Sequence, residues 1–116
     1  MKPFVAKITV SAIVLFTLFM EIWAYNNYSG NTEPPTKHTV KIFRMKFIPD
    51  HLTVKKGDTV EWINKDFYQH DVTDEKNKEW TSSPFNQNET WSKVITKDEQ
   101  YFCNLHKTMK GAIDIK

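Results

Sequence analysis

The stretch that decides the fold is YFCNLHKTMKGAIDIK, residues 101–116. It contains Cys103, His106 and Met109 at the spacing C-x2-H-x2-M, followed by Gly111. Side chains alternate along a straight strand, so three residues spaced in this way cannot all point to one side of it. They can converge from a tight loop between two strands, and Gly111 permits the chain to turn out of such a loop. The stretch therefore predicts the end of one strand, a loop that gathers three side chains, and a final strand.

The side chains of that loop define a ligand chemistry. Thiolate, imidazole and thioether form a soft-to-intermediate set that suits copper better than magnesium or calcium. A second imidazole would complete a copper site, and the sequence offers His38, His51 and His70 for it. His70 is the strongest candidate, because it follows the expected strand 60–64 by a short loop and so can lie at the same end as Cys103. His38 borders a linker and His51 lies in a turn, so both are interpreted as surface histidines.

The residues before that loop form short runs that favour β-strands. Val40 and Ile42 point one way, the alternation slips around Phe43, and it resumes at Met45, which suggests a strand with a bulge. No later stretch has helical periodicity, and about seven short strands within about 80 residues indicate a sandwich of two sheets. The expected fold class is therefore all-β, an antiparallel Greek-key β-sandwich preceded by an N-terminal apolar segment.

Composition excludes several classes of function. The 116 residues have room for one domain. The 16 Lys and Arg residues against 14 Asp and Glu leave a net charge of +2, which argues against nucleic acid as a partner. The one cysteine, Cys103, excludes an internal disulfide and any cysteine-rich zinc or iron–sulfur site. Covalently attached haem is excluded as well, because no C-x-x-C-H motif occurs.

The N-terminal segment predicts export from the cytoplasm. Two lysines precede an apolar run over residues 8–20, which is shorter than the roughly 20 residues of a membrane span and fits a signal-peptide core. Residues 1–24 are interpreted as a cleaved signal peptide or an uncleaved membrane anchor, with an ordinary N-terminal helix as the remaining alternative. Residues 25–37 have the composition of a linker, and residues 38–116 form the folded domain.

With these motifs the domain resembles the cupredoxins, the type-1 blue copper proteins of the plastocyanin/azurin superfamily, and within them it is most similar to the amicyanins. The resemblance rests on VKIFRMKFIPDHLTVKKGDTVEWIN, residues 40–64, on His70 and Trp91, and on the closing YFC-x2-H-x2-M-x-G. The gap of two residues between His106 and Met109 is the amicyanin-like feature. Plastocyanin-like loops are longer.

The resemblance implies one copper ion, cycling between Cu(I) and Cu(II). The ligands that it implies are His70, Cys103, His106 and Met109. It also implies that Asn64, behind the ligands, fastens the cysteine loop by hydrogen bonds. Gln69 and Leu105 depart from the family pattern, because relatives often have proline before each histidine ligand, and this bears on the rigidity of the loop. Lys107 places a charge where relatives tend to have an apolar docking surface, and this bears on the identity of the partner.

The expected function is one-electron transfer between redox partners outside the cytoplasm, in the periplasm or at the outer face of the membrane. Catalysis is not expected, because the ligand set leaves no obvious open coordination position. The implied partners are a donor and an acceptor such as a dehydrogenase, a cytochrome, an oxidase or a reductase. The domain is expected to be a monomer, either soluble or tethered by its N-terminal segment. The alternatives are copper delivery or storage, and an interaction domain without metal.

Several conspicuous residues also have plainer interpretations. Trp62, Trp80 and Trp91 are more often core packing than electron relays. His106 is expected to be partly exposed at the tip of a tight loop, while the neighbouring ligands are buried. Lys107 either helps to make a positive rim around that imidazole or only keeps the surface soluble.

Overall fold

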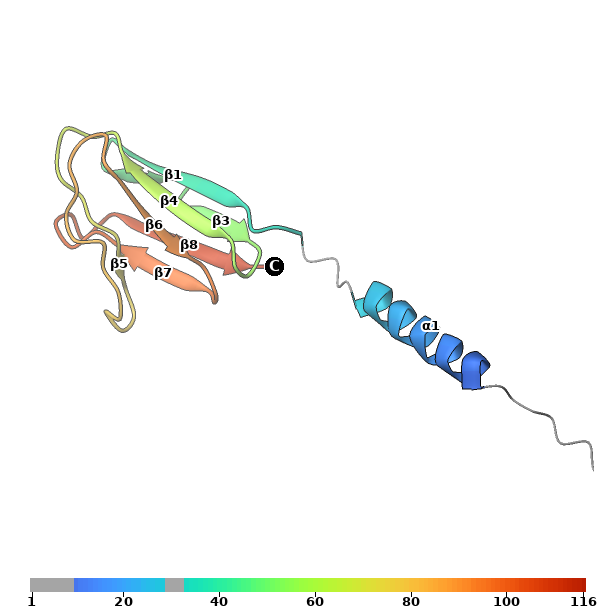
Figure 1. Cartoon of the computed structure of the whole chain (residues 1–116). Coiled ribbons are helices and arrows are strands. Elements are labelled where there is room, and N and C mark those ends of the chain that lie inside the picture. The colour runs from blue at the N-terminus through green and yellow to red at the C-terminus, as the bar shows by residue number, and fades with distance from the viewer. Residues whose placement is uncertain (1–9, 29–32) are drawn as a thin grey trace, which may run out of the picture. The chain divides into compact units, whose positions relative to one another are not determined.

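The computed structural model describes residues 10–28 and 33–116 of the chain (Figure 1). The chain divides into two compact units, Met1–Pro34 and Pro35–Lys116. The two lysines expected to open a signal sequence lie outside the described residues, as do residues 29–32 of the expected linker.

The first unit contains the helix α1, Val10–Tyr28. Its sequence, VSAIVLFTLFMEIWAYNNY, is apolar around most of its circumference, and large side chains such as Phe16 and Trp23 are exposed. Among the described residues, no helix is both long enough and apolar enough to cross a membrane. The assignment of residues 1–24 as a signal peptide or an anchor stays a prediction.

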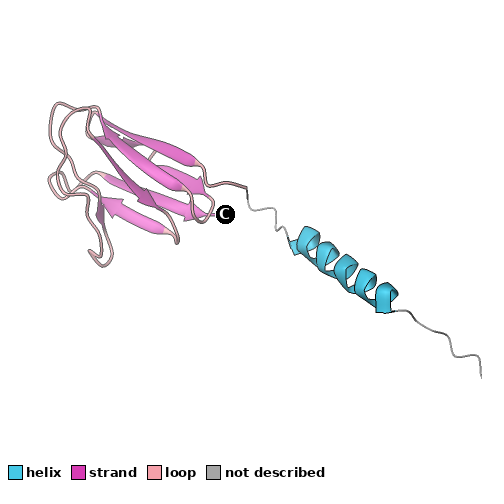
Figure 2. Ribbon diagram, in the orientation of Figure 1, coloured by secondary structure: helices cyan, strands magenta, loops and turns pink. Residues whose placement is uncertain are grey.

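The second unit is a sandwich of two four-stranded sheets (Figures 1 and 2). The first sheet has the order β2-β1-β4-β6, with β1 at Lys37–Phe43, β2 at Lys46–Ile48, β4 at Thr59–Asn64 and β6 at Thr90–Val94. The second sheet has the order β3-β8-β7-β5, with β3 at His51–Val54, β5 at Thr73–Asp74, β7 at Glu99–Phe102 and β8 at Lys110–Ile115.

The expected β-sandwich is confirmed, although its sheets are mixed rather than purely antiparallel. β1 pairs with β4 in parallel, and β3 pairs with β8 in parallel, while the remaining strand pairs are antiparallel. The chain leaves the first sheet after β2, contributes β3 to the second sheet and returns as β4 in the direction of β1. Alternation of apolar residues shows which side chains face the core, but it does not reveal the direction of the neighbouring strand.

The slip around Phe43 is a hairpin turn and not a bulge, so that part of the strand prediction was wrong. Phe43 pairs with Lys46, and the two residues between them, Arg44 and Met45, have φ angles of 52° and 62°. Positive φ at both central positions is typical of a type I′ turn, which normally uses Asn or Gly. Arg44 and Met45 hold this turn because the Asp66 carboxylate accepts hydrogen bonds from both of their amides, at 2.7 and 2.9 Å.

Strand β4 supplies the centre of the core. Its residues alternate so that Val60, Trp62 and Asn64 are buried. The Trp62 ring meets the Tyr101 ring of β7 edge to face, with centroids 5.3 Å apart. Gly111 of β8 lies against the Tyr101 ring, and a Cβ atom at this position would overlap it. The glycine expected to let the chain turn therefore serves the close packing of β8 on the aromatic core.

Candidate metal centre

Three potential ligands converge from two loops of the sandwich. His70 lies between β4 and β5, and Cys103 and His106 lie between β7 and β8. Cys103 Sγ is 3.8 Å from His70 Nδ1 and 4.0 Å from His106 Nδ1, and the two Nδ1 atoms are 3.2 Å apart. Within the part of the chain that the structure describes, this is the group of three His, Cys, Asp or Glu residues able to hold a metal ion together.

The three distances fit one shared ion. Metal–nitrogen and metal–sulfur bonds of about 2.0 to 2.3 Å place donor atoms around a common ion about 3 to 4 Å apart. Each imidazole turns its Nδ1 atom toward the cysteine sulfur, so both rings offer the same nitrogen. Two imidazoles and a thiolate favour copper or zinc over magnesium and calcium. The donors present therefore suit the copper ion that the sequence implied.

Backbone and side-chain hydrogen bonds hold the loop of His70. The His70 carbonyl accepts a hydrogen bond from the Phe85 amide at 2.9 Å, and the His70 amide donates to the Phe85 carbonyl at 3.3 Å. The buried Asn64 amide group donates to the carbonyls of Tyr68 and Phe85, at 2.8 and 3.1 Å. Its Oδ1 accepts from the Asp66 amide at 2.9 Å. These bonds of Asn64 fasten the loop of His70, whereas the resemblance implied the cysteine loop.

The Asp66 side chain orients the His70 ring. Its Oδ2 lies 2.9 Å from His70 Nε2, the ring nitrogen that faces away from the sulfur. Burial acts to raise the pKa of Asp66, but hydrogen bonds from the Met45 and Arg44 amides and from His70 outweigh it, so the pKa is lowered. Burial lowers the pKa of His70 against the opposing effect of Asp66. A neutral ring that donates its Nε2 proton to Asp66 leaves the Nδ1 lone pair for a metal.

Asp71, next to His70, joins the loop of His70 to the cysteine loop. Its backbone amide donates to Cys103 Sγ at 3.4 Å, so an N–H group faces the sulfur. Its carboxylate accepts a hydrogen bond from the Asn104 amide at 2.9 Å. Within the loop, the Cys103 amide donates to the Met109 carbonyl at 3.1 Å, and the Met109 amide donates to the His106 carbonyl at 3.0 Å. The loop is therefore a compact turn closed by its own backbone.

The four ligands implied by the resemblance differ in exposure. His70 and Cys103 are 0% exposed and Met109 is 3% exposed. His106 is half-buried and follows the exposed Leu105. One imidazole thus reaches toward the surface while the thiol and the thioether are shielded from water, as we expected from the length of the loop.

The other two candidate histidines are engaged elsewhere. His38 Nε2 of β1 lies 2.8 Å from Asp58, and His51 Nε2 at the start of β3 lies 2.6 Å from Asp114. His51 is exposed, as expected, whereas His38 is half-buried because it packs beside Asp58. Neither belongs to the group around Cys103.

Comparison with known proteins identifies the family. Residues 35–116 match the copper binding proteins of the plastocyanin/azurin family. The chain belongs to this family. Among curated proteins, this cupredoxin is 24% identical over 128 residues to amicyanin from Paracoccus versutus, and the match covers 92% of each chain.

Solved structures share the cupredoxin fold. The crystal structure of amicyanin from Paracoccus versutus superimposes with a TM-score of 0.64 and 24% identity, over 73% of this chain and 86% of that chain. A reduced amicyanin variant gives a TM-score of 0.61 with 28% identity, over 67% of this chain and 80% of that chain. A copper-containing nitrite reductase from Thermus scotoductus gives 0.62 with 26% identity, over 72% of this chain but only 23% of the reductase.

Two acidic residues of this cupredoxin site were not anticipated from the sequence. Asp66 and Asp71 lie in the same loop as His70, where the Asp66 carboxylate contacts the His70 ring and the Asp71 amide donates to Cys103 Sγ. The sequence marks them only by their nearness to the candidate ligand His70, and an ordinary surface aspartate can be equally near. Met109, in contrast, is buried in the ligand loop as expected. Its place as an axial ligand stays a proposal.

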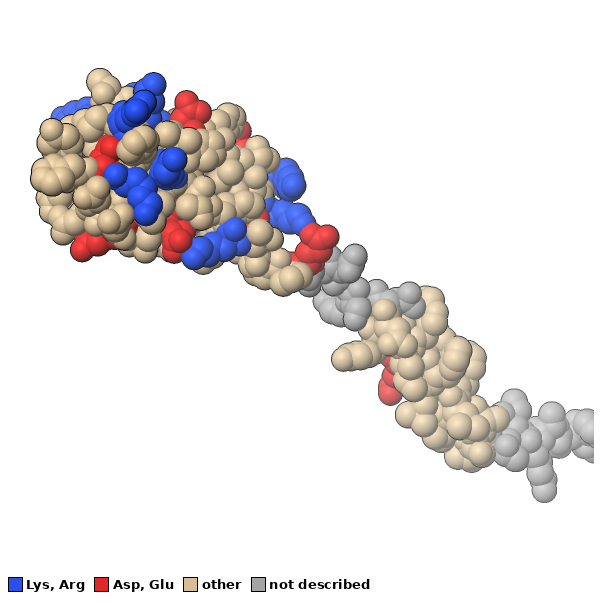
Figure 3. Space-filling view, turned by 90° about the horizontal axis from the view of Figure 1, so that it is seen from above, with Lys and Arg blue, Asp and Glu red and all other residues tan. Residues whose placement is uncertain are grey.

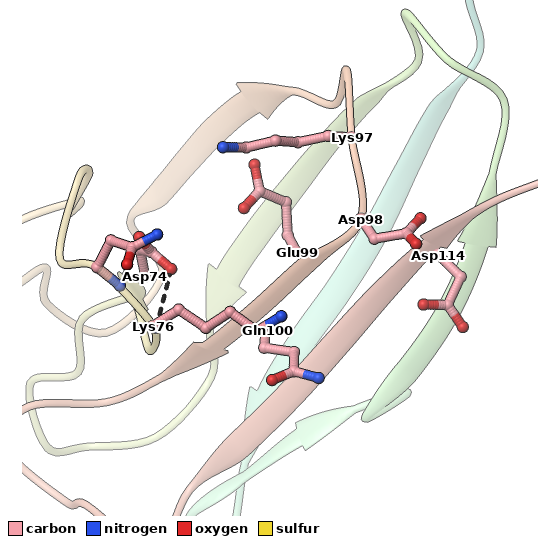
Figure 4. A pocket seen from close by; sticks show the side chains of 8 residues that line it. Asp74, Lys76, Lys97, Asp98, Glu99, Gln100 and Asp114 are labelled. Atoms are coloured by element: carbon pink, nitrogen blue, oxygen red, sulfur yellow. Dashed lines mark hydrogen bonds between the residues drawn. The ribbon is translucent and has the colours of Figure 1, made fainter.

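The pocket drawn in Figure 4 contributes no second ligand cluster. Its lining includes Asp74, Lys97, Glu99 and Asp114. The carboxylates already have partners, since Asp74 accepts hydrogen bonds from backbone amides and Glu99 pairs with Lys93 at 3.0 Å. Asp114 pairs with His51. These groups stabilise loops and strand ends.

Proposed function

We propose that this cupredoxin carries single electrons through one type-1 (blue) copper ion bound by His70, Cys103 and His106, with Met109 as a weak axial ligand. The observation that carries the proposal is the convergence of one thiol sulfur and two imidazole nitrogens within 4.8 Å of one another. Two histidines, a cysteine and a weak axial methionine form the donor set of blue copper sites. A copper ion bound there would supply reversible exchange of one electron.

The residues around the ligands keep the shape of the site constant. Asp66 holds the His70 ring from behind, and the Asp71 amide faces the Cys103 sulfur. A carrier exchanges electrons fastest when both oxidation states need the same geometry, because little has to move. The hydrogen bonds that fix ligands before the metal arrives therefore support electron transfer rather than metal exchange.

His106 is the proposed site of electron exit and entry. It is half-buried, and exposed apolar side chains lie in the same loops, with Leu105 49%, Phe67 84% and Tyr68 63% exposed. Lys107 follows His106 in the sequence. The face of the domain drawn in Figure 3 carries Lys and Arg side chains together with some Asp and Glu side chains. We expect the partner to present an acidic rim around an apolar centre, because complementary charge raises the rate of encounter.

The proposed partners are a donor and an acceptor redox protein, and the domain is proposed to act as a monomer in the periplasm or at the outer face of the membrane. The apolar character of the N-terminal segment supports export of the chain. The domain is proposed to be a carrier and not an enzyme, because four protein ligands leave no position for a substrate. The related nitrite reductase is an enzyme, but this chain covers 23% of it.

Electrochemistry of the copper-loaded full chain tests the proposal. We expect one reversible one-electron wave, with copper retained in both oxidation states when a Cu(I) chelator is present. A delivery or storage protein would instead bind Cu(I) without an intense visible thiolate band and would pass it to the chelator. Failure to bind copper at all would support an interaction domain without metal, and either result would contradict electron carriage.

A further inference from the structure

Four aromatic rings form a continuous series of contacts through the domain. The ring centroids are 5.3 Å apart between Tyr101 and Trp62, 5.5 Å between Trp62 and Trp91, and 5.8 Å between Trp91 and Trp80. Trp62 and Trp91 are direct partners across β4 and β6. Tyr101 and Trp62 are fully buried, whereas Trp91 and Trp80 are half-buried. The series therefore leads from the strand that precedes Cys103 outward to solvent.

The polar atoms of these rings differ in their partners. Trp62 Nε1 and Tyr101 Oη are buried without a hydrogen-bond partner. Trp80 Nε1, in contrast, donates to Glu99 Oε2 at 3.2 Å. Loss of an electron makes an indole N–H or a phenol O–H strongly acidic, so oxidation is easier where a base can accept the proton. Among these rings, Trp80 has a carboxylate in that position.

Tyr101 is poorly suited to be the ring on which the radical comes to rest. Burial raises its pKa to about 12, and its hydroxyl has no acceptor for the proton. The three tryptophans are therefore the rings that can be oxidised one after another. The order Trp62, Trp91, Trp80 leads away from Cys103 and toward the surface.

Lys93 also distinguishes the environment of Trp80, the outermost ring, from that of the other rings. Its Nζ lies 5.1 Å from the centroid of the Trp80 ring and 3.0 Å from Glu99 Oε1. A positive charge over an aromatic ring disfavours a second positive charge on that ring. An oxidised Trp80 is therefore driven to release its Nε1 proton and to become a neutral radical.

We propose that Trp62, Trp91 and Trp80 conduct an oxidising equivalent out of the core, with Trp80 and Glu99 as its end point. A strong one-electron oxidant, such as a peroxide-derived radical, removes one electron from Trp62. Trp91 gives one electron to the Trp62 radical cation, and Trp80 gives one electron to the Trp91 radical cation. Trp80 passes its Nε1 proton to Glu99, which leaves a neutral radical and a carboxylic acid. A small thiol or ascorbate then supplies one electron at the surface, and Glu99 returns the proton.

This path protects the oxidisable side chains of the ligand loop. Cys103 and Met109 are buried, and oxidation of a thiol beyond the sulfenic acid is irreversible without dedicated repair. The inner end of the path is Trp62 of β4, whose ring contacts Tyr101, and Tyr101 precedes Cys103 by two residues. The proposal does not depend on copper, because the rings and the carboxylate that carry the electron and the proton all belong to the chain.

Ultraviolet photoionisation of the full chain tests the path, because light removes electrons from tryptophans whether or not they are buried. A Trp23→Phe background removes the tryptophan of α1 and leaves the three of the domain. Peptide mapping by mass spectrometry locates the stable oxidation products. We expect the products to be concentrated at Trp80, with Trp62 spared. Equal oxidation of all three tryptophans would overturn the proposal.

Removal of the middle ring gives the sharpest variant. Trp91→Phe keeps an aromatic side chain at the position but replaces the indole with a ring that is much harder to oxidise. The share of oxidised Trp62 should rise several-fold, and the share at Trp80 should fall. An unchanged distribution would show that no electron moves through Trp91.

A second variant separates electron transfer from migration of light energy between the rings. Glu99→Gln keeps an oxygen acceptor for Trp80 Nε1 but cannot take up its proton, so oxidation should shift from Trp80 to Trp91. Glu79→Gln removes an exposed carboxylate paired with Lys97 and should leave the distribution unchanged. If both variants match the parent, Glu99 is not the proton acceptor and the proposal fails.

Discussion

The two loops that meet at the metal centre are built differently. The loop of His70 is fastened by side chains, because Asn64 binds the Tyr68 carbonyl and Asp66 holds the imidazole. The cysteine loop is closed by its own backbone, and its histidine, His106, reaches the surface. One loop therefore holds its proposed ligand in place, and the other leaves its proposed ligand accessible. The difference shows how a small domain can separate holding a metal from exchanging electrons.

The comparison predicts opposite behaviour when either imidazole is removed. His106→Gly should bind free imidazole from solution, which enters the half-buried position and restores the visible absorption of the Cu(II) protein. His70→Gly should not be restored, because that position is 0% exposed and is closed by Asp66. Absorption spectra with and without added imidazole measure the effect. Equal recovery of the visible absorption in both variants would show that the two loops do not differ in accessibility.

The next largest effect is expected from the two aspartates that fasten the loops. Asp66→Asn weakens the hydrogen bond to His70 and should lower copper affinity about 10- to 100-fold, as other changes behind metal ligands do. It should also raise the reduction potential, because a less basic imidazole stabilises Cu(II) less. The energy of the visible band should change little, since that band reports on the sulfur.

Asp71→Asn is the matched substitution at the aspartate that contacts the cysteine loop. Asp71 holds the Asn104 amide and faces Cys103, so this variant should shift the visible band and change the potential less. Absorption spectra and voltammetry of both variants measure the visible band and the reduction potential. The same response from Asp66→Asn and Asp71→Asn would mean that the loops do not act separately.

Met109→Gln tests whether Met109 is the weak axial ligand that we propose. Copper should stay bound, and the reduction potential should fall, because an amide oxygen is a harder ligand that favours Cu(II) over Cu(I). Voltammetry measures the shift against the parent protein. A potential equal to that of the parent would remove Met109 from the ligand set.

The smallest effect is expected from Lys107→Glu at the edge of the accessible loop. Electron transfer with an acidic partner should slow at low salt, and the difference should shrink as ionic strength rises, because salt screens exposed charges. Stopped-flow kinetics over a range of salt concentrations measure this. Rates that match the parent at every salt concentration would show that Lys107 serves solubility alone.

The convergence of side chains in the cysteine loop could be predicted from sequence because the proposed ligands lie close together in the chain. Cys103, His106 and Met109 are spaced for one tight turn, and His70 was the histidine placed at the same end of a strand. The alternation of β4 likewise identified the buried face that carries Trp62. Local spacing and periodicity are properties that a single sequence displays directly.

The features that were missed depend on contacts between distant residues. The hairpin at Arg44 and Met45 lacks the usual Asn or Gly, and it forms because Asp66, more than twenty positions away, accepts both amides at 2.7 and 2.9 Å. Gly111 was interpreted as a turn residue, yet its missing side chain makes room for Tyr101. Such reasons are visible only once the partners are in place.

A Cu(II) titration of the full chain tests the central claim most directly. We expect an intense visible thiolate-to-copper band that grows linearly and stops at one equivalent, with the signal lost in a parallel titration of Cys103→Ala. Cys103 supplies the one thiolate available, and without it the site keeps only two imidazoles and a thioether. No visible band in the parent protein, or an intense band that survives in Cys103→Ala, would contradict the assignment of a blue copper centre to these residues.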